Sequence, residues 1–155
     1  MTLPELASVG RSNGAAIEEV MWTPGEHSLD VFRADVSAAC ALKRLPSTAD
    51  ANDDRPVHLV LGFSRAALGQ TGDGHFSPVG AYHAGTDRVL LLDTARFKYP
   101  PHWVELERLW AAQAAPDPET GLPRGYLRVR AARASAACCH TAWAKGGGRV
   151  GGGGG

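Results

Sequence analysis

This sequence has no net charge, no long apolar run and few cysteines, and each of these features argues against a class of protein. The chain of 155 residues carries 16 basic and 16 acidic side chains, so its formal net charge is zero. Binding to nucleic acid or to an anionic membrane surface usually needs a basic excess. No apolar run approaches the roughly 20 residues that a membrane-spanning helix requires. We therefore expect neither a nucleic-acid partner nor a membrane partner.

Cysteine is limited to Cys40, Cys138 and Cys139. The number is odd, and adjacent cysteines bond to each other only with strain, so a disulfide scaffold is not expected. The N-terminal segment also lacks the basic and apolar parts of a secretory signal. These features predict a reducing compartment, with the cytoplasm as the expected location. They indicate nothing about oligomeric state.

The pattern of apolar residues predicts one domain that mixes helices and strands. Ser28 is a good N-cap, and the helix after it should bury Phe32, Val36 and Cys40 on one face. The tail is so rich in alanine and glycine that it should be disordered. The expected segments are helices over 3–11, 28–40 and 102–113, strands over 15–22, 57–63, 75–83, 88–93 and 125–129, and the tail over 131–155.

The most informative local pattern is a predicted hairpin that brings together His75 and Asp93. Its two strands join through residues 84–87, so His75 falls opposite residues near 94 and the Asp93 carboxylate can reach the imidazole. A carboxylate that orients the ring is what a general-base histidine needs. The alternative is a surface hairpin that happens to carry a histidine and an aspartate.

Two sequence blocks resemble a known family. Residues 70–83 read QTGDGHFSPVGAYH and residues 92–103 read LDTARFKYPPHW. These blocks and their spacing resemble phytochelatin synthase, a glutathione γ-glutamylcysteinyltransferase of the papain-like clan. The resemblance covers residues 3–130, about the second half of the family's catalytic domain. It implies an α+β, papain-like domain over 1–130, with helices packed on one side of an antiparallel sheet and the N-terminal, nucleophile-bearing half missing.

The resemblance also assigns roles to single residues. It makes His75 the catalytic histidine and Asp93 the aspartate that orients it. Gly74 lies where the family contacts bound γ-glutamylcysteine through its backbone. Asp117 and Arg124 match the pair that holds the γ-glutamyl group, and a carboxylate with a guanidinium suits its α-ammonium and α-carboxylate. Asp117 has a simpler alternative as a turn residue that ends a helix.

Arg96 and Tyr99 match positions near the acceptor glutathione. Arg96 has a structural alternative, an ion pair with Asp93 or Asp87. Neither residue has a role that spacing alone would indicate.

The sequence departs from the family at its nucleophile, because no cysteine precedes Cys40. The family's cysteine begins a helix, where the helix dipole lowers the thiol pKa. Cys40 instead lies near the end of its predicted helix, on the buried face, and we interpret it as structural. Cys138, Cys139 and His140 are soft or borderline metal ligands, but a vicinal pair in a tail is a poor cage, so we predict no structured metal site.

The implied reaction is γ-glutamylcysteinyl transfer from glutathione to glutathione or to a growing phytochelatin peptide. No tightly bound cofactor is expected; cadmium, zinc or copper ions would act as activators, mainly as glutathione thiolates. Because the nucleophile is absent, we interpret the chain as a fragment of such an enzyme. Two alternatives stay open: a non-catalytic module that binds glutathione or metal thiolates, and a γ-glutamyl peptide hydrolase.

Overall fold

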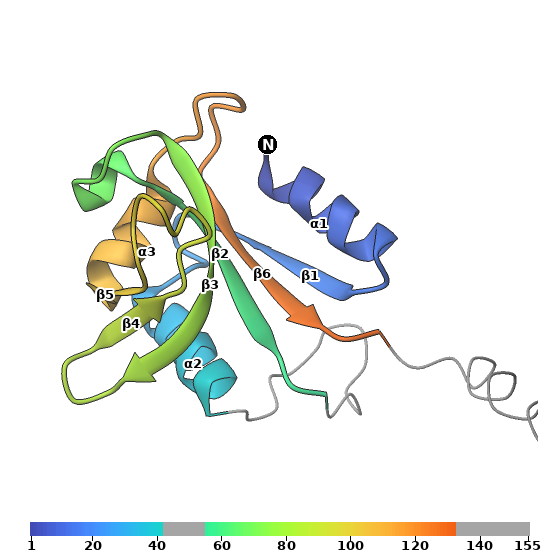
Figure 1. Cartoon of the computed structure of the whole chain (residues 1–155), viewed down its shortest axis with the longest axis horizontal. Helices are drawn as coiled ribbons and strands as arrows, with labels where there is room; N and C mark the ends of the chain where they lie inside the picture. Colours follow the sequence, from blue (N-terminus) through green and yellow to red (C-terminus); the bar gives the residue numbers. More distant parts are fainter. Residues whose placement is uncertain (42–54, 133–155) are drawn as a thin grey trace, which may run out of the picture.

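Six strands form one antiparallel sheet in the computed structural model, which describes residues 1–41 and 55–132 (Figure 1). The strands are β1 (Ala16–Met21), β2 (His58–Ser64), β3 (Gly74–His83), β4 (Arg88–Leu91), β5 (His102–Glu105) and β6 (Gly125–Arg130), in the order β1-β6-β2-β3-β4-β5. The helices are α1 (Leu3–Ser12), α2 (Leu29–Cys40) and α3 (Leu106–Ala114), with a short 3₁₀ turn, η1 (Ala66–Leu68). The predicted α+β class with an antiparallel sheet is confirmed.

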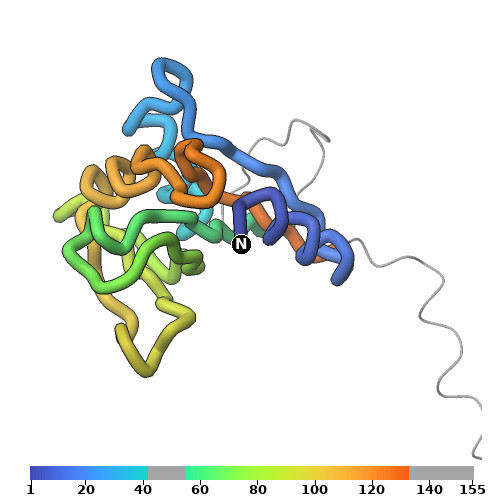
Figure 2. Tube along the Cα trace, turned by 90° about the horizontal axis from the view of Figure 1, so that it is seen from above, coloured from blue at the N-terminus to red at the C-terminus, as the bar shows by residue number. Residues whose placement is uncertain are grey.

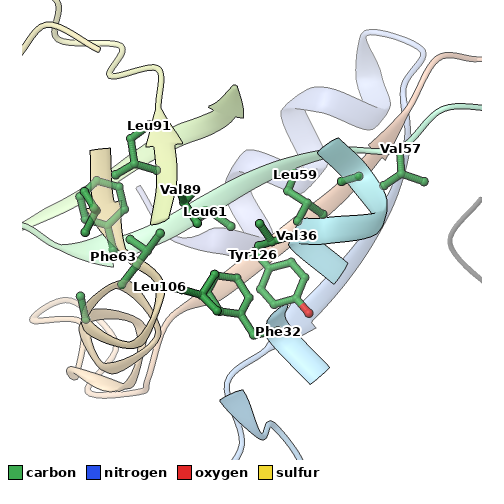
Figure 3. Packing of buried hydrophobic residues seen from close by; sticks show 14 residues of the cluster. Phe32, Val36, Val57, Leu59, Leu61, Phe63, Val89, Leu91, Leu106 and Tyr126 are labelled. Atoms are coloured by element: carbon green, nitrogen blue, oxygen red, sulfur yellow. The ribbon is translucent and has the colours of Figure 1, made fainter. Parts of the chain in front are cut away.

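Helices cover both faces of this sheet, so the prediction that they pack on one side was wrong. Neighbouring residues of a strand point to opposite faces. On β6, Tyr126 packs against Phe32 of α2, whereas Leu127 packs with Leu3 and Ala7 of α1. Figure 3 shows the larger cluster, between the sheet and the helices α2 and α3. Seen from above, α1 runs along β1, away from α3 (Figure 2).

Local capping explains where the first two helices begin. The Thr2 hydroxyl accepts a hydrogen bond from the Glu5 backbone, and the Glu5 carboxylate accepts one from the Thr2 backbone, which together satisfy two free N–H groups. Ser28 caps α2 by accepting from the Val31 N–H, as predicted.

The segment after Pro101 differs from the predicted helix over 102–113. Its first four residues form β5, which pairs with β4, and the helix begins only at Leu106. β5 supplies hydrogen-bond partners to the outer edge of β4. A helix over 102–113 would have left that edge unpaired. Trp103 therefore lies on an edge strand with 48% of its surface exposed, and not on the helix predicted over 102–113. Trp110 stays on α3 and packs against the core.

Most of the predicted tail, including Cys138, Cys139 and His140, lies outside the described residues, so its disorder stays a prediction. Among the helices in the described ranges, none combines the length and apolar character needed to cross a membrane.

Candidate functional site

His75 and Asp93 are hydrogen-bonded to each other at one end of the sheet. His75 is the second residue of β3, and Asp93 follows the end of β4 by two residues. The imidazole Nε2 lies 2.9 Å from Asp93 Oδ1. Asp93 is buried, 19% of the His75 side chain is exposed, and the ring of Phe63 meets the imidazole edge-on. The predicted proximity of the two residues is confirmed, although the contact forms just beyond the paired part of β4.

The hydrogen bonds around His75 determine which ring nitrogen carries the proton. An ionised Asp93 can only accept, so Nε2 must be the donor. Thr94 Oγ1 lies 3.1 Å from the same nitrogen and donates its own hydrogen to the Phe76 carbonyl. Both neighbours thus require hydrogen on Nε2. In the neutral ring Nδ1 is then unprotonated, and no described residue hydrogen-bonds it, so it is available as a base.

The surroundings keep the imidazole neutral and the carboxylate ionised. Burial lowers the pKa of His75, the guanidinium of Arg65 lowers it further, and Asp93 only partly opposes them. Burial alone would raise the pKa of Asp93, but hydrogen bonds from Arg65 and from the Ala95 backbone outweigh it, so the pKa of Asp93 is lowered. A neutral imidazole beside a carboxylate is the state that a general base requires.

Arg65 is a site residue that the sequence analysis missed. It is 4% exposed and donates to Asp93 Oδ1 at 2.9 Å and to Gln70 Oε1 at 2.7 Å. The other end of Gln70 meets His102 Nε2 at 2.9 Å. The guanidinium also lies 4.7 Å from the ring centre of Tyr99. The one available signal was an arginine directly after the predominantly apolar segment that forms β2, where a buried strand ends.

A second polar corner contains Gly74, Asp117 and Arg124. The two charged side chains lie 3.5 Å apart, and Arg124 is buried. One guanidinium nitrogen donates to the carbonyls of Ala115 and Pro116, while the buried Nε has no hydrogen-bond partner within residues 1–41 and 55–132. A Cβ atom at Gly74 would lie 3.1 Å from Arg124 and 3.4 Å from Asp117, so glycine allows the strand to pass this close to the pair.

One pocket joins the two corners. Its volume is about 230 Å³, and its lining comes from residues 73–76 at the start of β3, from the segment between α3 and β6, and from Met1. The lining includes Gly74, His75, Phe76, Asp117, Glu119 and Arg124. The structure therefore brings His75 and the charged pair to the same cavity.

Arg96 and Tyr99, the other two predicted site residues, do not line this pocket. The Tyr99 hydroxyl accepts from the Thr71 N–H at 2.7 Å. Arg96 is exposed and makes no hydrogen bond or ion pair within the described ranges. Its alternative role as a structural ion pair was wrong, because Asp93 and Asp87 are each paired with another arginine.

Cys40 lies far from His75 along the sheet. It ends α2, at the end of the sheet where β2 begins, whereas His75 lies at the opposite end, where β3 begins (Figure 1). The thiol is half-buried against the core, and burial raises its pKa. These properties agree with a structural cysteine and not with a nucleophile.

Within residues 1–41 and 55–132, no three His, Cys, Asp or Glu side chains gather closely enough to hold a metal ion. The vicinal cysteines of the tail lie outside those ranges, so the prediction made for them is untested.

Comparison with known proteins identifies the family. The profile of the phytochelatin synthase family matches residues 1–126. Glutathione gamma-glutamylcysteinyltransferase 3 from Lotus japonicus is 39% identical over 149 residues, 92% of this chain and 28% of its own length. Glutathione gamma-glutamylcysteinyltransferase 1 from Triticum aestivum is 44% identical over 119 residues, 72% of this chain and 23% of its own. The glutathione gamma-glutamylcysteinyltransferase of Schizosaccharomyces pombe is 35% identical over 127 residues, 82% of this chain and 27% of its own.

The chain thus spans only about a quarter of the length of these curated relatives. The profile, however, matches most of the chain and both polar corners of the pocket. This chain belongs to the phytochelatin synthase family.

Proposed function

We propose that this chain provides the histidine, the aspartate and the donor-binding pair of a site that transfers γ-glutamylcysteine from glutathione to glutathione or to phytochelatin. The observation that carries the proposal is the shared pocket of His75, Asp117 and Arg124. The relatives are named as glutathione γ-glutamylcysteinyltransferases, which agrees with this proposal. The fold would then be papain-like and the protein cytoplasmic.

In the proposed reaction His75 moves protons at two points. Its Nδ1 takes the proton of a cysteine thiol, and the thiolate attacks the carbonyl carbon of the Cys–Gly amide of glutathione. The C–N bond breaks, the imidazolium protonates the leaving glycine, and a thioester remains. The α-amine of the acceptor then attacks the thioester, gives a proton to His75, and releases the thiol. Asp93 holds the ring and stabilises its charged form.

The donor fits the charged pair of the pocket. The α-carboxylate of its γ-glutamyl group would pair with Arg124, whose Nε has no partner in the described part of the chain, and the α-ammonium would pair with Asp117. Arg96 and Tyr99 would contact the acceptor. Cadmium, zinc or copper ions would enter as glutathione thiolates, as part of the substrate.

The thiol in this scheme does not come from Cys40, which lies at the other end of the sheet. We propose that a cysteine outside these 155 residues supplies it. The isolated chain should then make no phytochelatin from glutathione and cadmium. Turnover by the isolated chain that disappears in Cys40→Ser would contradict this assignment.

A chimera tests the proposed transfer. Residues 1–126 replace the matching segment of the Lotus japonicus relative, and chromatography measures phytochelatin made from glutathione and cadmium. We expect product from the chimera, none from His75→Ala, and full activity from Arg88→Ala, which changes an exposed ion pair. A folded chimera that makes no product, or only hydrolyses glutathione, would refute the transferase proposal.

The second candidate is a module that binds glutathione without catalysis. Two observations favour it. The residues of the donor pocket all lie in the described part of the chain, and within that part no thiol lies beside His75. Calorimetry with glutathione on the isolated chain decides it, with Arg124→Ala as the test and Arg88→Ala as the matched control. An absence of heat, or heat that Arg124→Ala leaves unchanged, would eliminate this candidate.

A further inference from the structure

A directional chain of hydrogen bonds runs from β5 to the candidate base. His102 Nδ1 lies 2.8 Å from the Pro100 carbonyl, which can only accept, so this nitrogen carries hydrogen. In the neutral ring Nε2 then accepts, and it faces the amide nitrogen of Gln70. The amide oxygen of Gln70 is thereby turned to Arg65, which binds it through one guanidinium nitrogen and Asp93 through another.

Arg65 also bonds the same Asp93 oxygen that faces His75. Oδ1 receives the hydrogen bonds from Arg65, from His75 and from the Ala95 backbone. Oδ2 is buried and has no hydrogen-bond partner among the residues that the structure describes. Because all donors converge on one oxygen, rotation of the carboxylate would break three hydrogen bonds. Burying a guanidinium is costly unless it is paired and bonded, as it is here.

We propose that Arg65 is a positioning residue, which fixes Asp93 Oδ1 toward His75 and is itself held by Gln70 and His102. The carboxylate then keeps hydrogen on His75 Nε2 and leaves Nδ1 as the base. The catalytic meaning of this arrangement rests on the proposed function, but the arrangement itself is measurable without turnover.

Nuclear magnetic resonance of ¹⁵N-labelled histidine in the full chain tests the proposal, because it reports the tautomer and the titration of each ring. His75→Gln assigns the His75 signal. The charged groups near that ring are Asp93, Arg65 and Lys98. The pocket around it also contains Asp73, Asp117, Glu119, Arg124 and the N-terminal ammonium of Met1. Each variant therefore changes one side chain and keeps the other charged groups around His75.

We expect Arg65→Gln to shift the His75 titration upward, because a neighbouring positive charge is lost, and to reduce the share of the Nε2–H tautomer. Arg65→Lys should restore the titration, since it keeps the charge, but not the tautomer, since lysine lacks the forked donors. Arg88→Gln is the matched control, because it removes an arginine that pairs with Glu105 on the exposed side of β4. It should change neither property.

Gln70→Ala keeps the test decisive if the Arg65 variants do not fold, because it removes only the support of the guanidinium. It should reduce the Nε2–H share at His75 and alter the His102 signal. A folded Arg65→Gln chain with the wild-type His75 titration and tautomer would overturn the proposal. An unchanged His75 tautomer in Gln70→Ala would overturn the part assigned to Gln70. Neither result depends on whether the chain binds glutathione.

Discussion

Two buried aspartates, Asp93 and Asp35, are each held by an arginine, yet only Asp93 bonds a side chain that lines the pocket, His75. The same oxygen of Asp35 accepts from the Tyr126 hydroxyl and from two nitrogens of Arg128. Asp93 accepts from its arginine and from His75, whose second ring nitrogen has no partner in the described ranges. The side chains that bond Asp35 are Tyr126 and Arg128, and neither lines the pocket. The Asp93 cluster includes His75, the candidate base, which does line it.

The difference teaches that a buried carboxylate–arginine pair does not by itself mark a reactive site. Burial and the nearby Asp35 raise the pKa of Tyr126 far above its ordinary value, so this phenol stays protonated as a donor. Burial lowers the pKa of His75, which keeps its ring neutral and its Nδ1 unprotonated. The Asp35 cluster should therefore contribute to stability, and the Asp93 cluster to chemistry.

The largest expected effect breaks the chemistry and spares the fold. His75→Gln in the chimera should lower kcat by roughly 10²–10⁴-fold, the usual contribution of a general acid–base group. Its midpoint of urea unfolding should stay near that of the unsubstituted chimera, because a polar ring at the pocket surface is replaced by a polar amide. A variant that loses activity only in proportion to lost folded protein would make His75 structural, and the two clusters would no longer differ.

Asp35→Ala should have the opposite signature. It leaves Arg128 and Tyr126 without their buried acceptor, which should cost about 3–5 kcal/mol of unfolding free energy. Urea unfolding of the isolated chain measures the loss. In whatever fraction stays folded, the His75 tautomer should match the wild type. A disturbed His75 tautomer would show that the two clusters are coupled through the sheet.

The sequence predicted the hairpin and the His75–Asp93 contact because period-two patterns and a four-residue connection fix the register within a residue or two. It could not predict Arg65, because the partner of a buried charge depends on which loop folds over the strand end. Trp103 was misplaced for a related reason. Trp103 and Trp110 do have the spacing of one helical face, but residues 102–105 pair with the edge of β4 instead. The spacing of two tryptophans gives no information about an unpaired strand edge elsewhere in the chain.

A smaller effect probes the pocket itself. In Gly74→Ala, the added methyl group would lie 3.1 Å from a guanidinium nitrogen of Arg124, which is buried and has little room to retreat. We expect glutathione to bind about tenfold more weakly, equivalent to ~1.4 kcal/mol, in calorimetry. Gly85→Ala is the control, since its methyl group meets only the exposed His83 ring. Equal affinity in both variants would remove Gly74 from the binding site.

The smallest effect is a pH dependence that both clusters share. Burial lowers the pKa of His75, and it also lowers the pKa of His27, whose ring contacts Tyr126 in the Asp35 cluster. An imidazole with a lowered pKa resists a proton that the unfolded chain accepts below about pH 6.5. Stability is therefore full above that pH and falls as the pH drops from the unfolded pKa toward the folded one. The lowered pKa of Asp93 adds a loss only in stronger acid, below about pH 4.

Replacing either histidine by glutamine should flatten this fall, and replacing both should flatten it by the sum if the clusters are independent. Urea unfolding at several values between about pH 7 and pH 5 measures the slope. An unaltered slope in His75→Gln would mean that His75 binds a proton as readily in the folded chain as in the unfolded one. The lowered pKa of His75 would then be contradicted. A double variant that departs from the sum would instead reveal an energetic link between the histidines of the two clusters.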